Sequence, residues 1–238
     1  MPIDRFFYDS PFTTHQKVQL EGIEFHHLAH VTRAKPGVVL ELVNGKGQLA
    51  SASLEKVEKR NATLYIEKIL EKPKPPFSVI LAQAIPRIQR LDFIIEKGTE
   101  LGLTELWLFP GQHSERKNLN EHQLDRLRTI TIAAMKQCGR LHLPTITIKP
   151  PLSKWEPIHF SSFFGDLSPD APPLLQSWQQ NPPKDGIIFF IGPESGFSDK
   201  EEEILGNLGA NGVKLHHNIL RTDTASLAAL TLINHLNY

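Results

Sequence analysis

The sequence predicts an α/β protein in which a small β-rich part precedes a larger parallel sheet. Short strand-like runs around an Asn-Gly turn fill the first part of the chain, five residues rich in proline follow at 72–76, and strands then alternate with helices to the end. Asn-Gly between two strands predicts a hairpin, and alternating strands and helices predict a parallel sheet with crossover helices. We therefore expect one domain at 1–71, a linker at 72–76 and a second domain at 77–238.

The first domain is expected to be a small β-barrel with one helix. Its apolar residues recur at strand or helical spacing in five segments. These are a strand at 5–8, a helix at 24–33, and strands at 38–43, 48–54 and 62–66. The linker Lys72-Pro73-Lys74-Pro75-Pro76 ends the pattern, because each proline removes a hydrogen-bond donor and fixes φ.

The second domain is expected to be the parallel sheet. Apolar runs of strand length alternate with amphipathic segments of helical period. The expected strands are 77–82, 105–109, 145–148, 160–164, 187–191 and 213–215, and the expected helices are 91–101, 121–138, 173–175, 199–208 and 224–236.

The overall composition is that of an ordinary globular protein. The chain has 238 residues, a formal net charge of zero, 40% hydrophobic and 22% charged residues. No apolar run approaches the roughly 20 residues of a membrane span, and the N-terminus lacks the apolar core of a signal peptide, so we expect a cytoplasmic protein. The single cysteine, Cys138, excludes an intrachain disulfide framework. The histidine pairs lack the cysteine or carboxylate that would complete a metal site, so we expect no metal.

The most informative stretch is the apolar run Ile187–Ile191 and the loop that follows it, Gly192-Pro193-Glu194-Ser195-Gly196. Ser198 and the acidic residues after it are typical of a capped helix start. Ligands of parallel α/β sheets bind at the carboxyl ends of strands, where this loop would lie. No lysine follows as in a phosphate-binding P-loop, and no serine is central as in a nucleophile elbow. A tight turn without a ligand remains the alternative.

A second loop, Ile219–Ala225, leads into the last helix. Arg221 follows an apolar run there, and Thr222, Asp223 or Thr224 can cap the helix. A guanidinium at the carboxyl edge of the sheet would favour an anionic or enolate-like ligand. Plain helix capping explains the threonines and Asp223 equally well.

Taken in order, the motifs resemble a known family. They are Glu96-Lys97-Gly98-Thr99-Glu100-Leu101-Gly102, Ser114-Glu115-Arg116, Gln137-Cys138-Gly139-Arg140, Gly192-Pro193-Glu194-Ser195-Gly196-Phe197-Ser198 and Leu220-Arg221-Thr222-Asp223-Thr224-Ala225. The chain resembles the RsmE family, the small-subunit ribosomal RNA uridine N3-methyltransferases of the SPOUT superfamily. The N-terminal part resembles that family's PUA-like barrel.

The resemblance implies a SPOUT-type parallel sheet with a trefoil knot, a homodimer, and S-adenosylmethionine (SAM) as cofactor. The partner would be 16S rRNA within the small ribosomal subunit, and the product a methyl group on N3 of a uridine. The implied cofactor-binding residues are Leu108, Phe109, Gly192, Pro193, Glu194, Ile219, Leu220, Arg221 and Thr222. The family has glycine where this chain has Ser195, and a glutamate where it has Asp223.

For the chemistry, we expect Arg221 to stabilise the uracil anion and a carboxylate, Glu194 or less favourably Asp223, to accept the N3 proton. The residues expected to contact the RNA backbone are Arg5, Arg33, Lys35, Arg116 and Arg140. Two alternatives stay open: another SPOUT enzyme that methylates a ribose or a transfer RNA base, and an RNA-binding protein without catalytic activity.

Overall fold

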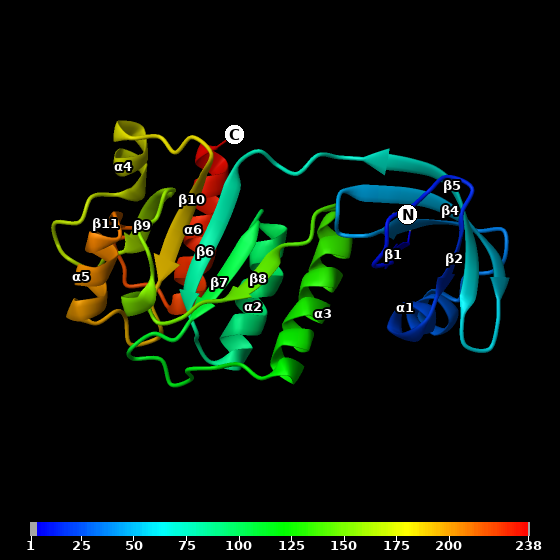
Figure 1. Cartoon of the computed structure of the whole chain (residues 1–238), viewed down its shortest axis with the longest axis horizontal. Helices are drawn as coiled ribbons and strands as arrows, with labels where there is room; N and C mark the ends of the chain where they lie inside the picture. The colour runs from blue at the N-terminus through cyan, green and yellow to red at the C-terminus, as the bar shows by residue number, and fades with distance from the viewer. Residues whose placement is uncertain (1–3, 238) are drawn as a thin grey trace. The chain divides into compact units, whose positions relative to one another are not determined.

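The computed structural model describes residues 4–237, which form two compact units (Figure 1). The first unit contains the residues up to Lys74 together with Ile132–Leu143, and the second contains Pro75–Thr131 and the residues from Pro144 onward. The chain passes from the first unit to the second after Lys74, inside the expected linker 72–76, and the units differ from the expected domains at one further place. The last turns of helix α3, Glu121–Cys138, and the residues after it belong to the first unit, although they lie within 77–238.

The first unit is built on a five-stranded sheet in the order β1-β3-β4-β5-β2. Strands β1 and β3 are parallel, and the other pairs are antiparallel. The strands are β1 Arg5–Phe7, β2 Lys17–Leu20, β3 Val39–Val43, β4 Gln48–Val57 and β5 Ala62–Glu71. Helix α1, Gly22–His26, continues into a wider turn, η1, at His27–Thr32.

Two features of this unit differ from the sequence-based prediction. Strand β2 was not predicted. Its polar residues Lys17 and Gln19 alternate with the buried Val18 and Leu20, but four residues are too short a pattern to indicate a strand without its partner β5. The predicted single helix at 24–33 changes to the wider η1 geometry and ends at Arg33, whose φ of 52° lies in the left-handed region.

The second unit is built on a six-stranded, fully parallel sheet in the order β11-β9-β10-β6-β7-β8. The strands are β6 Ser78–Ala84, β7 Glu105–Phe109, β8 Thr145–Ile148, β9 Ser161–Gly165, β10 Gly186–Ile191 and β11 Ala210–Val213. The helices are α2 Ile88–Glu100, α3 Glu121–Cys138, η2 Leu152–Lys154, α4 Leu174–Gln180, α5 Asp199–Asn207 and α6 Thr222–Leu236. The predicted alternation of strands and helices is therefore confirmed.

One strand lies elsewhere than predicted. The sequence predicted a strand at Val213-Lys214-Leu215, where two apolar residues flank a lysine. The structure has strand β11 at Ala210–Val213 instead. Asn211 and Gly212 have low intrinsic strand propensity, and the strand forms because it pairs with β9 at the edge of the sheet. Leu215 instead lies beyond the strand, in the segment that lines the candidate site.

Strand β10 is central, and every one of its residues is buried. Ile187 and Phe189 pack in a core with residues of α2 and α6. Ile188 and Phe190 point to the opposite face and pack in a second core with Leu205 of α5. Because both faces are covered, the strand is apolar at every position instead of alternating.

We expect Phe189→Ala to lower the free energy of unfolding by about 3–5 kcal/mol, because it leaves a cavity at a site with 0% exposure. Chemical denaturation of the whole chain measures this loss. The matched control is Ile148→Ala on the edge strand β8, where the side chain is 45% exposed and we expect a much smaller loss. Equal losses for the two variants would contradict the central position of β10.

Candidate active site

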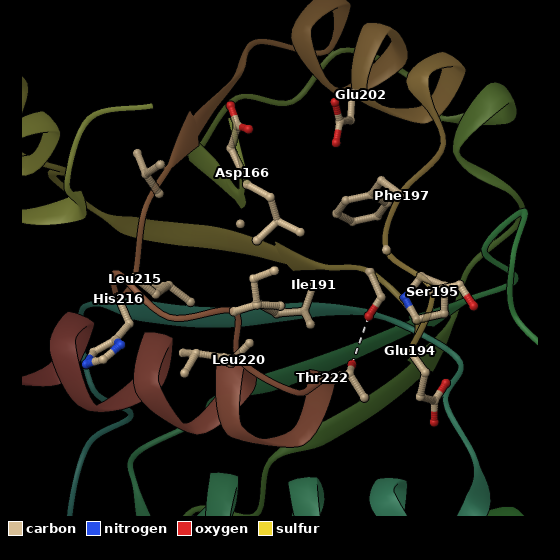
Figure 2. Close-up of a pocket in the computed structure, with 18 of the residues that line it drawn as sticks. Asp166, Ile191, Glu194, Ser195, Phe197, Glu202, Leu215, His216, Leu220 and Thr222 are labelled. Carbon is tan, nitrogen blue, oxygen red and sulfur yellow. Dashed lines mark hydrogen bonds between the residues drawn. The ribbon is translucent and has the colours of Figure 1, made fainter. Parts of the chain in front are cut away.

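A cavity of about 330 Å³ lies at the carboxyl ends of β9, β10 and β11 (Figure 2). Three separate segments of the second unit line it. They are Gly165–Leu167 after β9, Ile191–Phe197 after β10, and a segment after β11 with Leu215, His216 and Asn218–Leu220, joined by Glu202, Val213, Thr222 and Ala225. Both loops that the sequence singled out thus meet at one site, where parallel sheets bind ligands.

The loop after β10 is tight, and two glycines make it possible. A side chain at Gly192 would lie 3.0 Å from the backbone nitrogen of Phe197. Gly196 has a φ of +76°, and its N–H donates to Pro193 O at 2.9 Å. Among the non-glycine residues described, only His15 and Arg33 have positive φ, so Ser195 does not need the conformation that glycine favours. The serine is therefore compatible with this loop.

The loop ends in the predicted capped helix. The Ser198 hydroxyl accepts a hydrogen bond from the Glu201 N–H at 3.2 Å, and the Glu201 carboxylate accepts one from the Ser198 N–H at 3.0 Å. Glu201 also accepts from the backbone N–H of Gln112 at 2.8 Å. This buried carboxylate thus ties the loop after β7 to the start of α5.

A buried amide connects the loops beneath the cavity. Gln83, on the central strand β6, is fully buried, and its Nε2 donates to Thr222 Oγ1 at 3.0 Å. Thr222 Oγ1 in turn donates to Gly192 O at 2.8 Å, the dashed line in Figure 2. The Ser226 hydroxyl donates to Gln83 Oε1 at 2.7 Å. The start of α6 and the loop after β10 are therefore fixed to the same side chain.

One guanidinium joins the two candidate bases. Arg90 of α2 forms ion pairs with Glu194 at 3.2 Å and with Asp223 at 2.9 Å. Glu194 also accepts a hydrogen bond from the backbone N–H of Arg87 at 3.1 Å. In Figure 2 the Glu194 carboxylate points away from Asp166 and Glu202 at the other end of the cavity. Glu194 and Asp223, far apart in the sequence, are brought together by Arg90.

Arg221 immediately precedes α6 and is exposed. Within the described part of the chain its guanidinium forms no ion pair, and it does not line the cavity. Leu108 and Phe109 do not line it either, because both are fully buried at the end of β7. Gly165–Leu167, which the sequence did not single out, line the cavity instead.

The five residues expected to contact RNA lie in different surroundings. Arg33, Lys35 and Arg116 are exposed. Arg5 forms an ion pair with Glu41 at 2.6 Å, and its side chain is 19% exposed. Arg140 is partly buried, and this burial lowers the pKa of its guanidinium.

The far end of the cavity is acidic. Asp166 follows β9 and Glu202 lies in the first turn of α5, and both line the cavity (Figure 2). Burial raises the pKa of the Glu202 carboxyl, and repulsion from Asp166 and Asp199 raises it further. A cationic ligand group at this end would relieve that repulsion.

Sequence reasoning did not select Gln83, Arg90, Asp166 or Glu202 as site residues. For Gln83 there was a signal, since it is the one polar residue in the apolar run Val79–Ala84. Arg90, Asp166 and Glu202 belong to ordinary polar helix and loop positions in the sequence, and only the fold brings them to the site.

Residues 4–237 contain no group of three or more His, Cys, Asp or Glu side chains arranged to hold a metal ion. Nor do they contain a helix long and apolar enough to span a membrane.

Comparison with known proteins gives one consistent result. Residues 73–234 match the model of the RNA methyltransferase domain, and residues 20–67 match that of the RNA methyltransferase PUA domain. A ribosomal RNA small subunit methyltransferase E of Synechocystis is 30% identical over 92% of this chain and 73% of its own length. A protein of the same name from Buchnera aphidicola is 26% identical over 97% of this chain and 92% of its own.

Solved structures that resemble this chain are also methyltransferases. The ribosomal RNA small subunit methyltransferase E of Neisseria gonorrhoeae, bound to SAM, superimposes with a TM-score of 0.87 at 29% identity and covers 98% of each chain. A putative methyltransferase of Legionella pneumophila, in complex with SAM, gives a TM-score of 0.87 at 26% identity over 99% of this chain and 98% of its own.

We expect Gln83→Leu to destabilise the protein by about 1–3 kcal/mol, because Thr222 and Ser226 lose a buried hydrogen-bond partner. Chemical denaturation measures the change. The control is Gln89→Leu on α2, an exposed glutamine for which we expect almost no loss. If the two substitutions had the same effect, the buried network would not stabilise the site.

We expect Glu202→Gln to stabilise the protein at neutral and higher pH and to have little effect in acid. The pKa of Glu202 is raised in the folded state, so folding favours the protonated carboxyl. The stability that this protonation contributes is complete below the unfolded-state pKa and is lost as pH rises through the folded-state pKa, where the neutral glutamine avoids the loss. Melting temperatures of both proteins across a pH series measure the difference. A constant difference at every pH would contradict this origin.

Proposed function

The chain belongs to the ribosomal RNA small subunit methyltransferase E family, and from this premise we propose that it transfers a methyl group from SAM to N3 of a uridine in 16S rRNA. The observation that carries the proposal is the cavity of about 330 Å³, in which both motif loops meet. Relatives whose names specify small-subunit rRNA support the substrate class, and two similar structures bound to SAM support the cofactor.

The cavity fits the chemistry of SAM. The side chains of Ile191, Leu215 and Leu220 offer apolar contact for an adenine ring. Asp166 and Glu202 offer negative charge to the cationic parts of the cofactor, and Gly192 permits close approach of the backbone. We assign cofactor contacts to Gly192, Pro193, Glu194, Ile219, Leu220 and Thr222, which line the cavity. Arg221, which does not line it, is assigned to the acceptor. Leu108 and Phe109 would support the site from the core.

The sulfonium of bound SAM supplies an activated methyl group, so the chain's residues must orient the acceptor and remove one proton. Uridine N3 becomes a nucleophile only after its proton leaves. We propose that the Glu194 carboxylate accepts this proton as general base. Its orientation is fixed by Arg90 and by the backbone N–H of Arg87. Arg221, exposed and unpaired within the described residues, would stabilise the charge that develops on the uracil oxygens.

The chain organisation fits an RNA substrate. We propose that residues 1–71 form a PUA-like RNA-binding domain, that 72–76 are a linker, and that 77–238 form the methyltransferase domain. The match of residues 20–67 to the PUA model supports the first of these assignments. Arg5, Arg33, Lys35, Arg116 and Arg140 would contact RNA phosphates.

Three further properties follow from the family premise. We propose that the segment after β11 threads through a loop to form a trefoil knot, since it lines the same cavity as the loops after β9 and β10. We also propose that the enzyme works as a homodimer and acts in the cytoplasm, where its rRNA substrate is.

The decisive experiment incubates the full chain and SAM with small ribosomal subunits that lack the modification, followed by mass mapping of the methylated nucleotide. We expect one methyl group on N3 of one uridine. A methyl group found on a ribose or on transfer RNA would show that the proposed acceptor, uridine N3, is wrong. No methylation of any RNA, with no heat on titration with SAM, would identify an inactive RNA-binding protein.

We expect Arg221→Ala to lower kcat by about 100- to 1,000-fold, the usual effect of removing a charge-stabilising donor. Arg221→Lys should recover part of the rate because it restores the charge. Lys200→Ala, which removes an exposed charge on α5, is the control and should leave the rate unchanged. Near wild-type activity of Arg221→Ala would exclude its proposed role.

We expect Glu194→Gln to lower kcat by about 100- to 10,000-fold, as for loss of a general base. Asp223→Asn should cost much less, because Asp223 serves to hold Arg90. Single-turnover rates of both variants, with melting temperatures to confirm folding, make the comparison. If Asp223→Asn lowered the rate more than Glu194→Gln, Asp223 would be the residue that accepts the N3 proton.

A further inference from the structure

A second cavity of the second unit, about 340 Å³, shares no residue with the first. It lies between Trp107 of β7 and Ile188 of β10 on one side and the segment 149–160, which leads from β8 to β9, on the other. The proposed methylation does not use it. Its size is within the range of sites that bind small organic groups.

Two indole rings form the cavity's walls. The Trp107 and Trp155 rings are 5.7 Å apart and meet at 63°. The indole Nε1 of Trp107 donates to Glu105 at 3.1 Å, and that of Trp155 donates to Pro150 O at 2.8 Å. Both indole N–H groups are therefore satisfied within the protein.

The core holds Trp155 in place. Its ring lies 5.7 Å from that of Phe109 and 5.5 Å from that of Phe190. The short helix η2 adds backbone hydrogen bonds, from Lys154 N–H to Pro151 O at 2.9 Å and from Trp155 N–H to Leu152 O at 3.0 Å. The aromatic walls are thus preformed, which lowers the entropic cost of binding.

Lysines supply positive charge beside these rings. Lys149 Nζ lies 3.9 Å from the centre of the Trp107 ring. Lys154 is exposed, and within residues 4–237 neither lysine forms an ion pair with a carboxylate. Glu156 is the one carboxylate among the lining residues. Aromatic faces combined with unpaired cations are the composition by which proteins bind single-stranded nucleic acid.

We propose that this cavity binds an unpaired nucleotide of the RNA substrate, with its base against the Trp155 ring and its phosphate at Lys149 and Lys154. The proposal rests on the proposed function, because it presupposes an RNA partner. It adds a contact outside the cofactor cavity that would hold the RNA while another nucleotide is methylated.

The test measures binding of a fluorescein-labelled oligouridine of about twelve nucleotides, a length typical of single-strand sites, to the full chain by fluorescence anisotropy. Lys154→Glu reverses an exposed charge and should weaken binding about ten-fold. It should also reduce the slope of log affinity against log salt by about one. The matched control is Lys184→Glu, another exposed lysine of the second unit, which should change neither.

Trp155→Ala should weaken binding by about 5- to 100-fold through lost stacking, and Trp155→Phe should weaken it less because a ring remains. Melting temperatures identify any loss of folding in the tryptophan variants, and Lys154→Glu keeps the test valid if they fail to fold. Calorimetric affinity for SAM should be unchanged in Lys154→Glu, since the two cavities share no residue.

The outcomes separate the two proposals. If the wild type binds the oligouridine and the Lys154 and Trp155 variants bind it equally well, the cavity is not an RNA site and the proposed function stands. If the wild type binds neither oligouridine nor small-subunit rRNA, both proposals fail. If the variants change the sedimentation coefficient but not RNA affinity, the cavity is an interface with a second copy, and the RNA assignment is overturned.

Discussion

The candidate active site depends on a single buried amide. Gln83 sits in the central strand β6, and its side chain is hydrogen-bonded to Thr222 and Ser226 at the start of α6, while Thr222 is bonded to Gly192. In the chain, Gln83 is more than one hundred residues away from both Gly192 and Thr222. An unpaired amide in this core would be costly, so the network is stable only when all the segments are in place. The geometry of the candidate site is therefore coupled to the packing of the sheet.

Charge is divided between the two ends of the site. At one end Arg90 compensates Glu194 and Asp223, so the proposed base is oriented by a positive partner. At the other end Asp166 and Glu202 have no such partner among their hydrogen bonds and ion pairs as described, and the pKa of Glu202 is raised. A cofactor with a sulfonium charge suits this uneven distribution. The uncompensated carboxylates would favour SAM over its neutral thioether product, which would assist product release.

The proposal for the cavity at Trp107 and Trp155 adds an RNA contact on the methyltransferase unit itself. The family relationship assigns RNA binding most directly to the PUA part, residues 20–67. Aromatic walls with Lys149 and Lys154 would give the second unit a stacking contact that is largely independent of base identity. Such a contact adds affinity, while choice of the target uridine depends on the acceptor side of the site.

The sequence by itself determined the strand–loop–helix unit around Gly192, because an all-apolar strand, two glycines and a capping serine leave few local alternatives. It also determined the alternation of strands and helices and, through its motifs, the family. Only the tertiary structure decided which side chains share the site. Arg90 pairs with Glu194 and Asp223 across the sheet edge, Gly165–Leu167 line the cavity instead of Leu108 and Phe109, and β11 forms from weak strand formers. These features arise from contacts between distant segments, and local propensity carries no information about such contacts.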